Sequence, residues 1–201
     1  MPTRLYLIRH GEHTLPSGTL AGRLPGIYLS ERGKQQAEAV ARRLAKIPLA
    51  FVYTSPLERT RQTAEIVAAP HRLSATILEQ VIEIDFGDWQ GRTFDELADD
   101  PDWQRWNALR SLARCPGGEA MIEAQARAVQ ELETVARRCD GLEIAVVSHG
   151  DIIKAAVAWW LGIPLDLFQR IDIALGSITL VELGADAPLL RTIGERPAIS
   201  P

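Results

Sequence analysis

The chain has 201 residues, and its 46% hydrophobic and 24% charged residues are ordinary for a soluble globular protein. Its formal net charge of -4 excludes an overall basic field that would attract nucleic acid or an anionic membrane, so a few local cations must hold any anionic ligand. Two cysteines, Cys115 and Cys139, are too few for a disulfide framework and are expected to be free, partly buried thiols.

The first half of the chain predicts two strands, each followed by a helix. Residues 4–9 (RLYLIR) form a buried strand, and their apolar run is too short for a signal peptide or a membrane span, so we expect a cytoplasmic protein. Residues 30–47 have apolar side chains at helical spacing, with Ser30 as the N-cap. A second strand over 50–55 precedes a helix over 57–69.

The second half continues the alternation. Further strands are expected over 75–84, 142–150, 177–183 and 188–194, and further helices over 93–109 (broken near Pro101), 119–139 and 151–162. Neither an internal repeat nor a linker divides the sequence, so residues 1–201 are expected to be one domain. Alternating strands and helices predict an α/β fold, a mostly parallel sheet between two layers of helices.

Polar side chains gather where these strands end. They are Arg9, His10, Ser55, Arg59, Ser148 and His149, and Glu83 is expected to join them from the third strand. Because ligands bind outside the carboxyl ends of parallel strands, we expect these side chains to face one crevice.

This set of residue types suits phosphoryl transfer. Arginine presents a planar fork of donors that matches phosphate oxygens, and a neutral histidine can attack phosphorus. A carboxylic acid beside them can protonate the departing alkoxide if burial raises its pKa. The sequence therefore favours a covalent phosphohistidine route.

Some assignments have alternatives within the sequence. Arg61 competes with Arg59, and Asp85 and Asp88 compete with Glu83. A zinc site is a competing hypothesis, because histidines and a carboxylate are zinc ligands, but two arginines in the same crevice would repel a cation. Trp103 and Trp106 are expected either in the core or as a wall of the substrate site. The pair Trp159–Trp160 is expected in the core or at a subunit contact, which would allow a homodimer.

Five segments, in this order, resemble the motifs of the histidine phosphatase (phosphoglycerate mutase-like) superfamily: LIRHGE, TSPLERTRQTAEIV, IEIDFGDWQG, PGGEA and VVSHGDII. The resemblance covers roughly residues 4–183 and implies a phosphoglycerate mutase-like α/β/α sandwich that uses no metal or organic cofactor for hydrolysis. It implies His10 as the nucleophile and Glu83 as the proton donor. It also implies that the phosphoryl group is bound by Arg9, Arg59 and His149. More loosely, it implies that the substrate is bound by Gly22, Arg23, Thr14 and Gly150.

The sequence also departs from the family pattern. Pro16 stands where many members carry Asn, so that phosphate contact is expected either to be missing or to be supplied by Thr14 or Ser17. Asp151 replaces a frequent second glycine, and His13 stands where Ser or Thr is common. None of these changes removes a catalytic group.

Within the family, we expect a phosphate-monoester hydrolase acting on a small phosphorylated metabolite. The alternative is a phosphoglycerate mutase-type phosphomutase, but the segment 91–115 is short and acidic and lacks the cations that would grip a bisphosphate. A silent module that binds phosphorylated ligands is a third hypothesis, disfavoured because all four of His10, Arg59, Glu83 and His149 are present.

Overall fold

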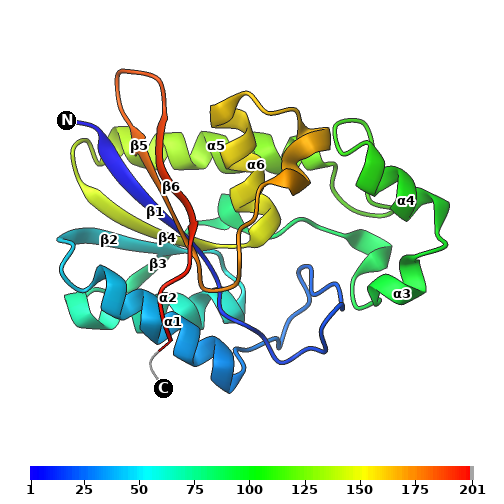
Figure 1. Cartoon of the computed structure of the whole chain (residues 1–201), viewed down its shortest axis with the longest axis horizontal. Coiled ribbons are helices and arrows are strands. Elements are labelled where there is room, and N and C mark those ends of the chain that lie inside the picture. Colours follow the sequence, from blue (N-terminus) through cyan, green and yellow to red (C-terminus); the bar gives the residue numbers. More distant parts are fainter. Residues whose placement is uncertain (200–201) are drawn as a thin grey trace.

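The computed structural model describes residues 1–199, which are built around a six-stranded sheet with the strand order β3-β2-β4-β1-β5-β6 (Figure 1). The strands are β1 (Thr3–Arg9), β2 (Leu49–Thr54), β3 (Ala75–Ile77), β4 (Glu143–Ser148), β5 (Ile178–Leu183) and β6 (Leu189–Glu195). The first four strands of this order are parallel to one another. At the edge formed by β1, β5 pairs antiparallel with β1, and β6 pairs antiparallel with β5. The expected mostly parallel sheet is confirmed.

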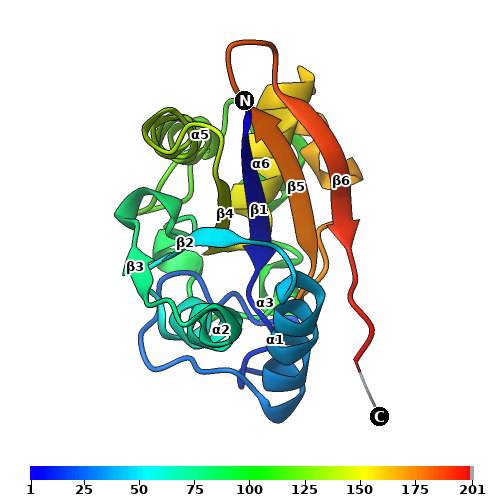
Figure 2. The same cartoon turned by 90° about the vertical axis from the view of Figure 1, so that its left-hand side faces the viewer.

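Helices cover both faces of the sheet. The α-helices of the described residues are α1 (Glu31–Leu44), α2 (Glu58–Ala68), α3 (Phe94–Leu97), α4 (Pro101–Ala108), α5 (Met121–Arg138) and α6 (Gly150–Leu161), of which α3 and α4 lie beside the sheet rather than over it. Helices α1 and α2 lie together on one face, and α5 and α6 lie on the other (Figure 2). Side chains of β1 alternate between the two cores: Leu5 and Leu7 face the core under α5 and α6, while Ile8 faces the core under α1 and α2.

Local signals place the start of several helices where the sequence predicts them. The Ser30 hydroxyl accepts a hydrogen bond from Gly33 N (3.1 Å) and so caps α1. The helical region broken near Pro101 becomes α3 and α4, because Asp100 caps α4 and Pro101 occupies its first turn. Among residues 1–199, no helix is both long enough and apolar enough to cross a membrane.

The expected third strand is wrong beyond Ile77. Strand β3 pairs with β2 only as far as Ile77, and Glu79–Val81 form a 3-10 turn. The Ser148 hydroxyl at the end of β4 donates to Val81 O (2.7 Å), which draws the chain away from the sheet edge and over the end of β4. This turn, rather than a strand, delivers Glu83 to the crevice.

Candidate active site

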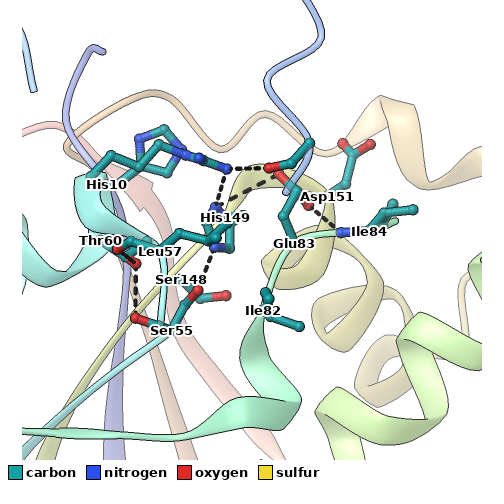
Figure 3. Close-up of polar contacts among 12 residues, drawn as sticks. His10, Ser55, Leu57, Thr60, Ile82, Glu83, Ile84, Ser148, His149 and Asp151 are labelled. Atoms are coloured by element: carbon teal, nitrogen blue, oxygen red, sulfur yellow. Dashed lines mark hydrogen bonds and ion pairs between the residues drawn. The ribbon is translucent and has the colours of Figure 1, made fainter. Parts of the chain in front are cut away.

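The carboxyl ends of β1, β2 and β4 open onto a pocket of about 560 Å³. Six of the residues expected at the site line it: Arg9, His10, Gly22, Arg59, Glu83 and Gly150. His149 is fully buried directly behind them, and Figure 3 shows it between His10 and Glu83. The sheet topology thus brings together the groups that the strand ends predicted.

His10 lines the pocket with an unprotonated ring nitrogen. Its Nδ1 lies 2.7 Å from Gly11 O, and because a carbonyl oxygen only accepts, Nδ1 carries the proton and Nε2 keeps its lone pair. Arg59 Nε donates to this Nε2 at 3.3 Å. Burial lowers the pKa of His10 well below its usual value, and the charges of Arg59 and Arg9 lower it further. His10 is therefore a neutral imidazole at neutral pH.

Two arginines, Arg59 fully buried and Arg9 partly buried, supply positive charge beside His10. Arg59, on the first turn of α2, is 1% exposed and donates to Gly22 O at 2.7 Å, while Arg9 donates to Ile173 O at 2.7 Å. Among residues 1–199, neither guanidinium forms an ion pair with a carboxylate, and Arg9 Nε and one terminal nitrogen of Arg59 have no hydrogen-bond partner. An anion in the pocket would satisfy these donors.

Two glycines make room for this arrangement. A Cβ at Gly150 would lie 2.9 Å from the Arg9 guanidinium carbon, so a side chain there would displace the arginine. Gly22 adopts a φ of +48°, the left-handed region that favours glycine, and turns its carbonyl toward Arg59. Because α6 begins at Gly150, its N-terminal dipole also adds positive potential at this end of the sheet.

Ser55 orients His149. Its Oγ lies 2.7 Å from His149 Nε2, and a guanidinium nitrogen of Arg59 lies 3.3 Å from Nδ1. Because Arg59 only donates, Nδ1 accepts in this arrangement and Nε2 donates to the Ser55 hydroxyl. Burial lowers the pKa of His149 well below its usual value, so this ring is also neutral.

Glu83 has the properties of a proton donor. Its Oε2 lies 3.8 Å from His149 Nδ1, and its Oε1 accepts from Ile84 N at 3.0 Å. Burial, followed by the negative charge of Asp151, raises the pKa of Glu83 to about 7. The carboxyl group is therefore partly protonated near neutral pH, as a general acid requires.

A network that the sequence analysis missed fixes the backbone of Glu83. Arg127 donates to Ile82 O (2.8 Å) and Glu83 O (3.2 Å), and Arg23 Nε donates to Glu83 O (2.8 Å). Glu119 pairs with both arginines, at 2.7 Å to Arg127 and 3.0 Å to Arg23. Glu119 belongs to the PGGE turn, whose motif was visible, but no local pattern links it to Glu83.

Two residues expected to bind substrate lie outside the pocket lining. Arg23 directs its guanidinium to the carbonyl of Glu83 and to Glu119 instead. The Thr14 side chain is exposed, because its backbone N–H pairs with Tyr28 O and turns the chain outward after His13. His13 does line the pocket, with its ring centroid 5.9 Å from that of His10.

The tryptophans divide between core and pocket. Trp106 is completely buried, whereas Trp103 lines the pocket and stacks on Phe94 at 6.0 Å. Trp159 is 58% exposed, so the expectation that it lies in the core is wrong. Trp160 is partly buried and packs against the core. Cys115 and Cys139 are buried and free, as expected.

Candidate metal ligands do not gather within residues 1–199: no group of three or more His, Cys, Asp or Glu side chains there could hold an ion. His10, His13 and His149 instead stand among guanidinium groups.

Comparison with known proteins adds an independent finding. The family model described as the histidine phosphatase superfamily (branch 1) matches residues 5–196. A curated relative, phosphoserine phosphatase 1 of Hydrogenobacter thermophilus, is 34% identical over 185 residues, which are 90% of this chain and 86% of that protein.

Solved structures show the same fold. YhfR of Bacillus stearothermophilus is similar with a TM-score of 0.90 and 30% identity, over 96% of this chain and 97% of that chain. A phosphoserine phosphatase mutant of Entamoeba histolytica, in complex with phosphoserine, has a TM-score of 0.87 and 27% identity, over 96% of each chain. These similarities confirm the expected α/β/α sandwich.

Proposed function

Because the chain belongs to the histidine phosphatase superfamily, we propose that it hydrolyses phosphate monoesters of small metabolites through a phosphohistidine formed on His10. One observation carries the proposal: the unprotonated Nε2 of a buried, neutral imidazole lies at the pocket beside two guanidinium groups that form no ion pair with a carboxylate within residues 1–199. Such a pocket is complementary to a phosphoryl dianion and to the charge that spreads over its oxygens during transfer.

The reaction would take two steps. In the first, His10 Nε2 attacks phosphorus, the bond from phosphorus to the ester oxygen breaks, and Glu83 gives its proton to that oxygen. In the second, Glu83 takes a proton from a water molecule, the water oxygen bonds to phosphorus, and the bond from phosphorus to Nε2 breaks. Arg9 and Arg59 would hold the phosphoryl oxygens throughout, and His149 would join them with its proton moved to Nδ1, while its Nε2 accepts from the Ser55 hydroxyl. The products are an alcohol and inorganic phosphate, and neither step calls for a metal or an organic cofactor.

Phosphate release from a panel of monoesters tests this proposal. The panel includes 3-phosphoglycerate, 2,3-bisphosphoglycerate and p-nitrophenyl phosphate, each assayed with and without a chelator. We expect release that survives chelation and falls by roughly 10³-fold or more in His10→Ala. His71→Ala is the matched control, because His71 lies in the turn after α2 and does not line the pocket.

A quenched reaction with radiolabelled substrate should trap a phosphoryl group on the protein that is stable in alkali and lost in acid, and His10→Ala should trap none. Activity that disappears with the chelator would contradict the metal-independent route. Isomerisation of phosphoglycerate without phosphate release would instead identify a phosphomutase. A folded protein that is silent across the panel would favour a module that only binds phosphorylated ligands.

A further inference from the structure

One histidine of the pocket has no part in the two steps proposed above. His13 follows the proposed nucleophile, His10, in the loop after β1 and lines the same pocket. Its ring centroid lies 5.9 Å from that of His10, with 32° between the ring planes. The charges of Arg59 and Arg9 also act on the His13 ring. His13 therefore stands at the end of the pocket where the phosphoryl group would be transferred.

The backbone of this loop directs the His13 side chain toward the pocket. His13 and Leu29 form an antiparallel bridge, and next to it Thr14 N donates to Tyr28 O at 3.0 Å. The backbone is therefore extended at His13, and neighbouring side chains on extended backbone point in opposite directions. The Thr14 side chain is exposed to solvent, whereas His13 lines the pocket. The two contacts with residues 28 and 29 fix this orientation.

The His13 ring has one nitrogen that a ligand can reach. Its Nδ1 is buried and, within residues 1–199, has no hydrogen-bond partner, so Nε2 is the nitrogen that can meet a molecule in the pocket. Burial lowers the pKa of His13, and the charges of Arg59 and Arg9 lower it further. The ring is therefore neutral at neutral pH and has one proton to donate. A neutral donor adds no further positive charge beside the two arginines.

The other side chains of this loop do not compete with His13 for a ligand. Thr14 and Ser17, the two side chains considered for a phosphate contact in place of the residue at Pro16, are exposed and do not line the pocket. Pro16 is exposed as well, and proline has no hydrogen-bond donor. Between His10 and Thr19, only His13 contributes to the pocket lining of the described chain. A donor from this loop therefore has to come from His13.

We propose that His13 is a further ligand of the phosphoryl group, whose Nε2–H donates a hydrogen bond to a non-bridging phosphoryl oxygen. This inference rests on the proposed function, because it takes the phosphoryl group to be transferred to and from His10. A phosphoryl oxygen only accepts hydrogen bonds, so it selects the tautomer of His13 with the proton on Nε2. A hydrogen bond to a charged acceptor is roughly twice as strong as one between neutral groups. Since His13 contacts the group that is transferred, its contribution is the same whichever alcohol the ester carries.

Titration calorimetry with inorganic phosphate tests this contact without any need for turnover. His13→Phe keeps a ring of similar size and removes the donor, so we expect the Kd for phosphate to rise about 10-fold. His13→Gln retains an N–H donor and should bind phosphate within about 3-fold of the wild type. His71→Phe is the matched control, since His71 lies in the turn after α2 and outside the pocket, and its Kd should equal that of the wild type.

In the phosphatase assay, His13→Phe should lower kcat/KM by the same factor for 3-phosphoglycerate and for p-nitrophenyl phosphate. A loss confined to one ester would overturn the inference, because it would place His13 against the alcohol. Unchanged phosphate binding by folded His13→Phe would overturn it too, as would a Kd raised instead by Thr14→Val or Ser17→Ala.

If His13→Phe does not fold, His13→Ala takes its place in the same comparison with His13→Gln, because residue 13 lies in a loop and is partly exposed. The two proposals can fail separately. A wild type that binds phosphate through His13 but releases none from any ester would contradict the proposed function and leave the His13 contact standing. A phosphatase whose Kd for phosphate does not depend on residue 13 would do the opposite.

Discussion

Oε2 of the Glu83 carboxyl group lies 3.8 Å from Nδ1 of His149, so the proposed proton donor is the neighbour of a proposed phosphoryl ligand. His149 is buried behind the pocket lining, Glu83 lines the pocket, and His10 stands on the other side of His149, with its ring centroid 5.2 Å away. A phosphoryl group on His10 would therefore carry its departing oxygen toward Glu83. This geometry makes the role of Glu83 depend on the leaving group.

Glu83→Gln should lower kcat/KM, which reports the step in which the alcohol departs, much more for alkyl phosphates than for p-nitrophenyl phosphate. An alkoxide needs a proton as it departs, a contribution of about 10²- to 10⁴-fold, whereas p-nitrophenolate leaves without one. In the wild type, kcat/KM for alkyl esters should fall as pH rises through about 7, where Glu83 loses its proton. Measurement of kcat/KM against pH for both ester types checks this.

Asp88→Asn is the control for that experiment, because Asp88 is an exposed carboxylate in the same loop and should leave both activities unchanged. An equal loss of kcat/KM on alkyl and aryl esters in Glu83→Gln would show that Glu83 does not protonate the leaving group.

Ser55→Ala should reduce kcat by about 5- to 30-fold while KM changes little. The substitution leaves His149 Nε2 buried without its partner at 2.7 Å, a loss of roughly 1–2 kcal/mol, and frees the ring to rotate. Steady-state kinetics and a thermal melt of the same samples separate the two effects. Thr60→Val is the control, since it removes a buried hydroxyl from the same turn that does not contact His149. If both variants lose kcat equally, the orientation of His149 is not what Ser55 provides.

Arg127→Met should have the same kind of effect on the kinetics as Glu83→Gln, but a smaller one. The substitution removes the hydrogen bonds to the carbonyls of Ile82 and Glu83, so the carboxyl group is held less well, and we expect about a 10-fold loss in kcat/KM for alkyl esters. Because Arg127 acts through Glu83, p-nitrophenyl phosphate should be affected less. Arg137→Met, an exposed position on the same helix, should behave as the wild type. A uniform loss on both esters would assign Arg127 a purely structural role.

Much of the candidate site could be predicted because its residues adjoin strand ends. His10 follows β1 and His149 follows β4 directly, so predicting the strands also placed the side chains. Glu83 was expected for the wrong reason: the apolar run 75–84 has the composition of a strand, but a hydrogen bond from Ser148, distant in sequence, turns it out of the sheet. Neither the hydrophobic periodicity of residues 75–84 nor their strand propensity contains information about that contact.

The supporting residues were not predictable in the same way. Arg127 reaches Glu83 across 44 positions of sequence, and nothing near Arg127 distinguishes it from the other arginines of α5. Arg23 sits in a motif of the expected substrate region, yet its side chain turns to the Glu83 backbone. Trp103 and Trp106 differ by three positions, and only the packing of α4 decides that one lines the pocket while the other fills the core.

Glu83→Gln should also stabilise the fold, and more so at alkaline pH. The pKa of Glu83 is raised in the folded protein to about 7, so the folded state favours the protonated form, and stability present at low pH is lost as pH rises through about 7. Gln cannot ionise and avoids this loss, so its gain in unfolding free energy at pH 8 should exceed that at pH 5 by about 2 kcal/mol. Urea denaturation of both proteins at the two pH values measures the difference, with Asp88→Asn as the variant that should show none. A gain that is the same at both pH values would mean that Glu83 is not held protonated by burial and by the charge of Asp151.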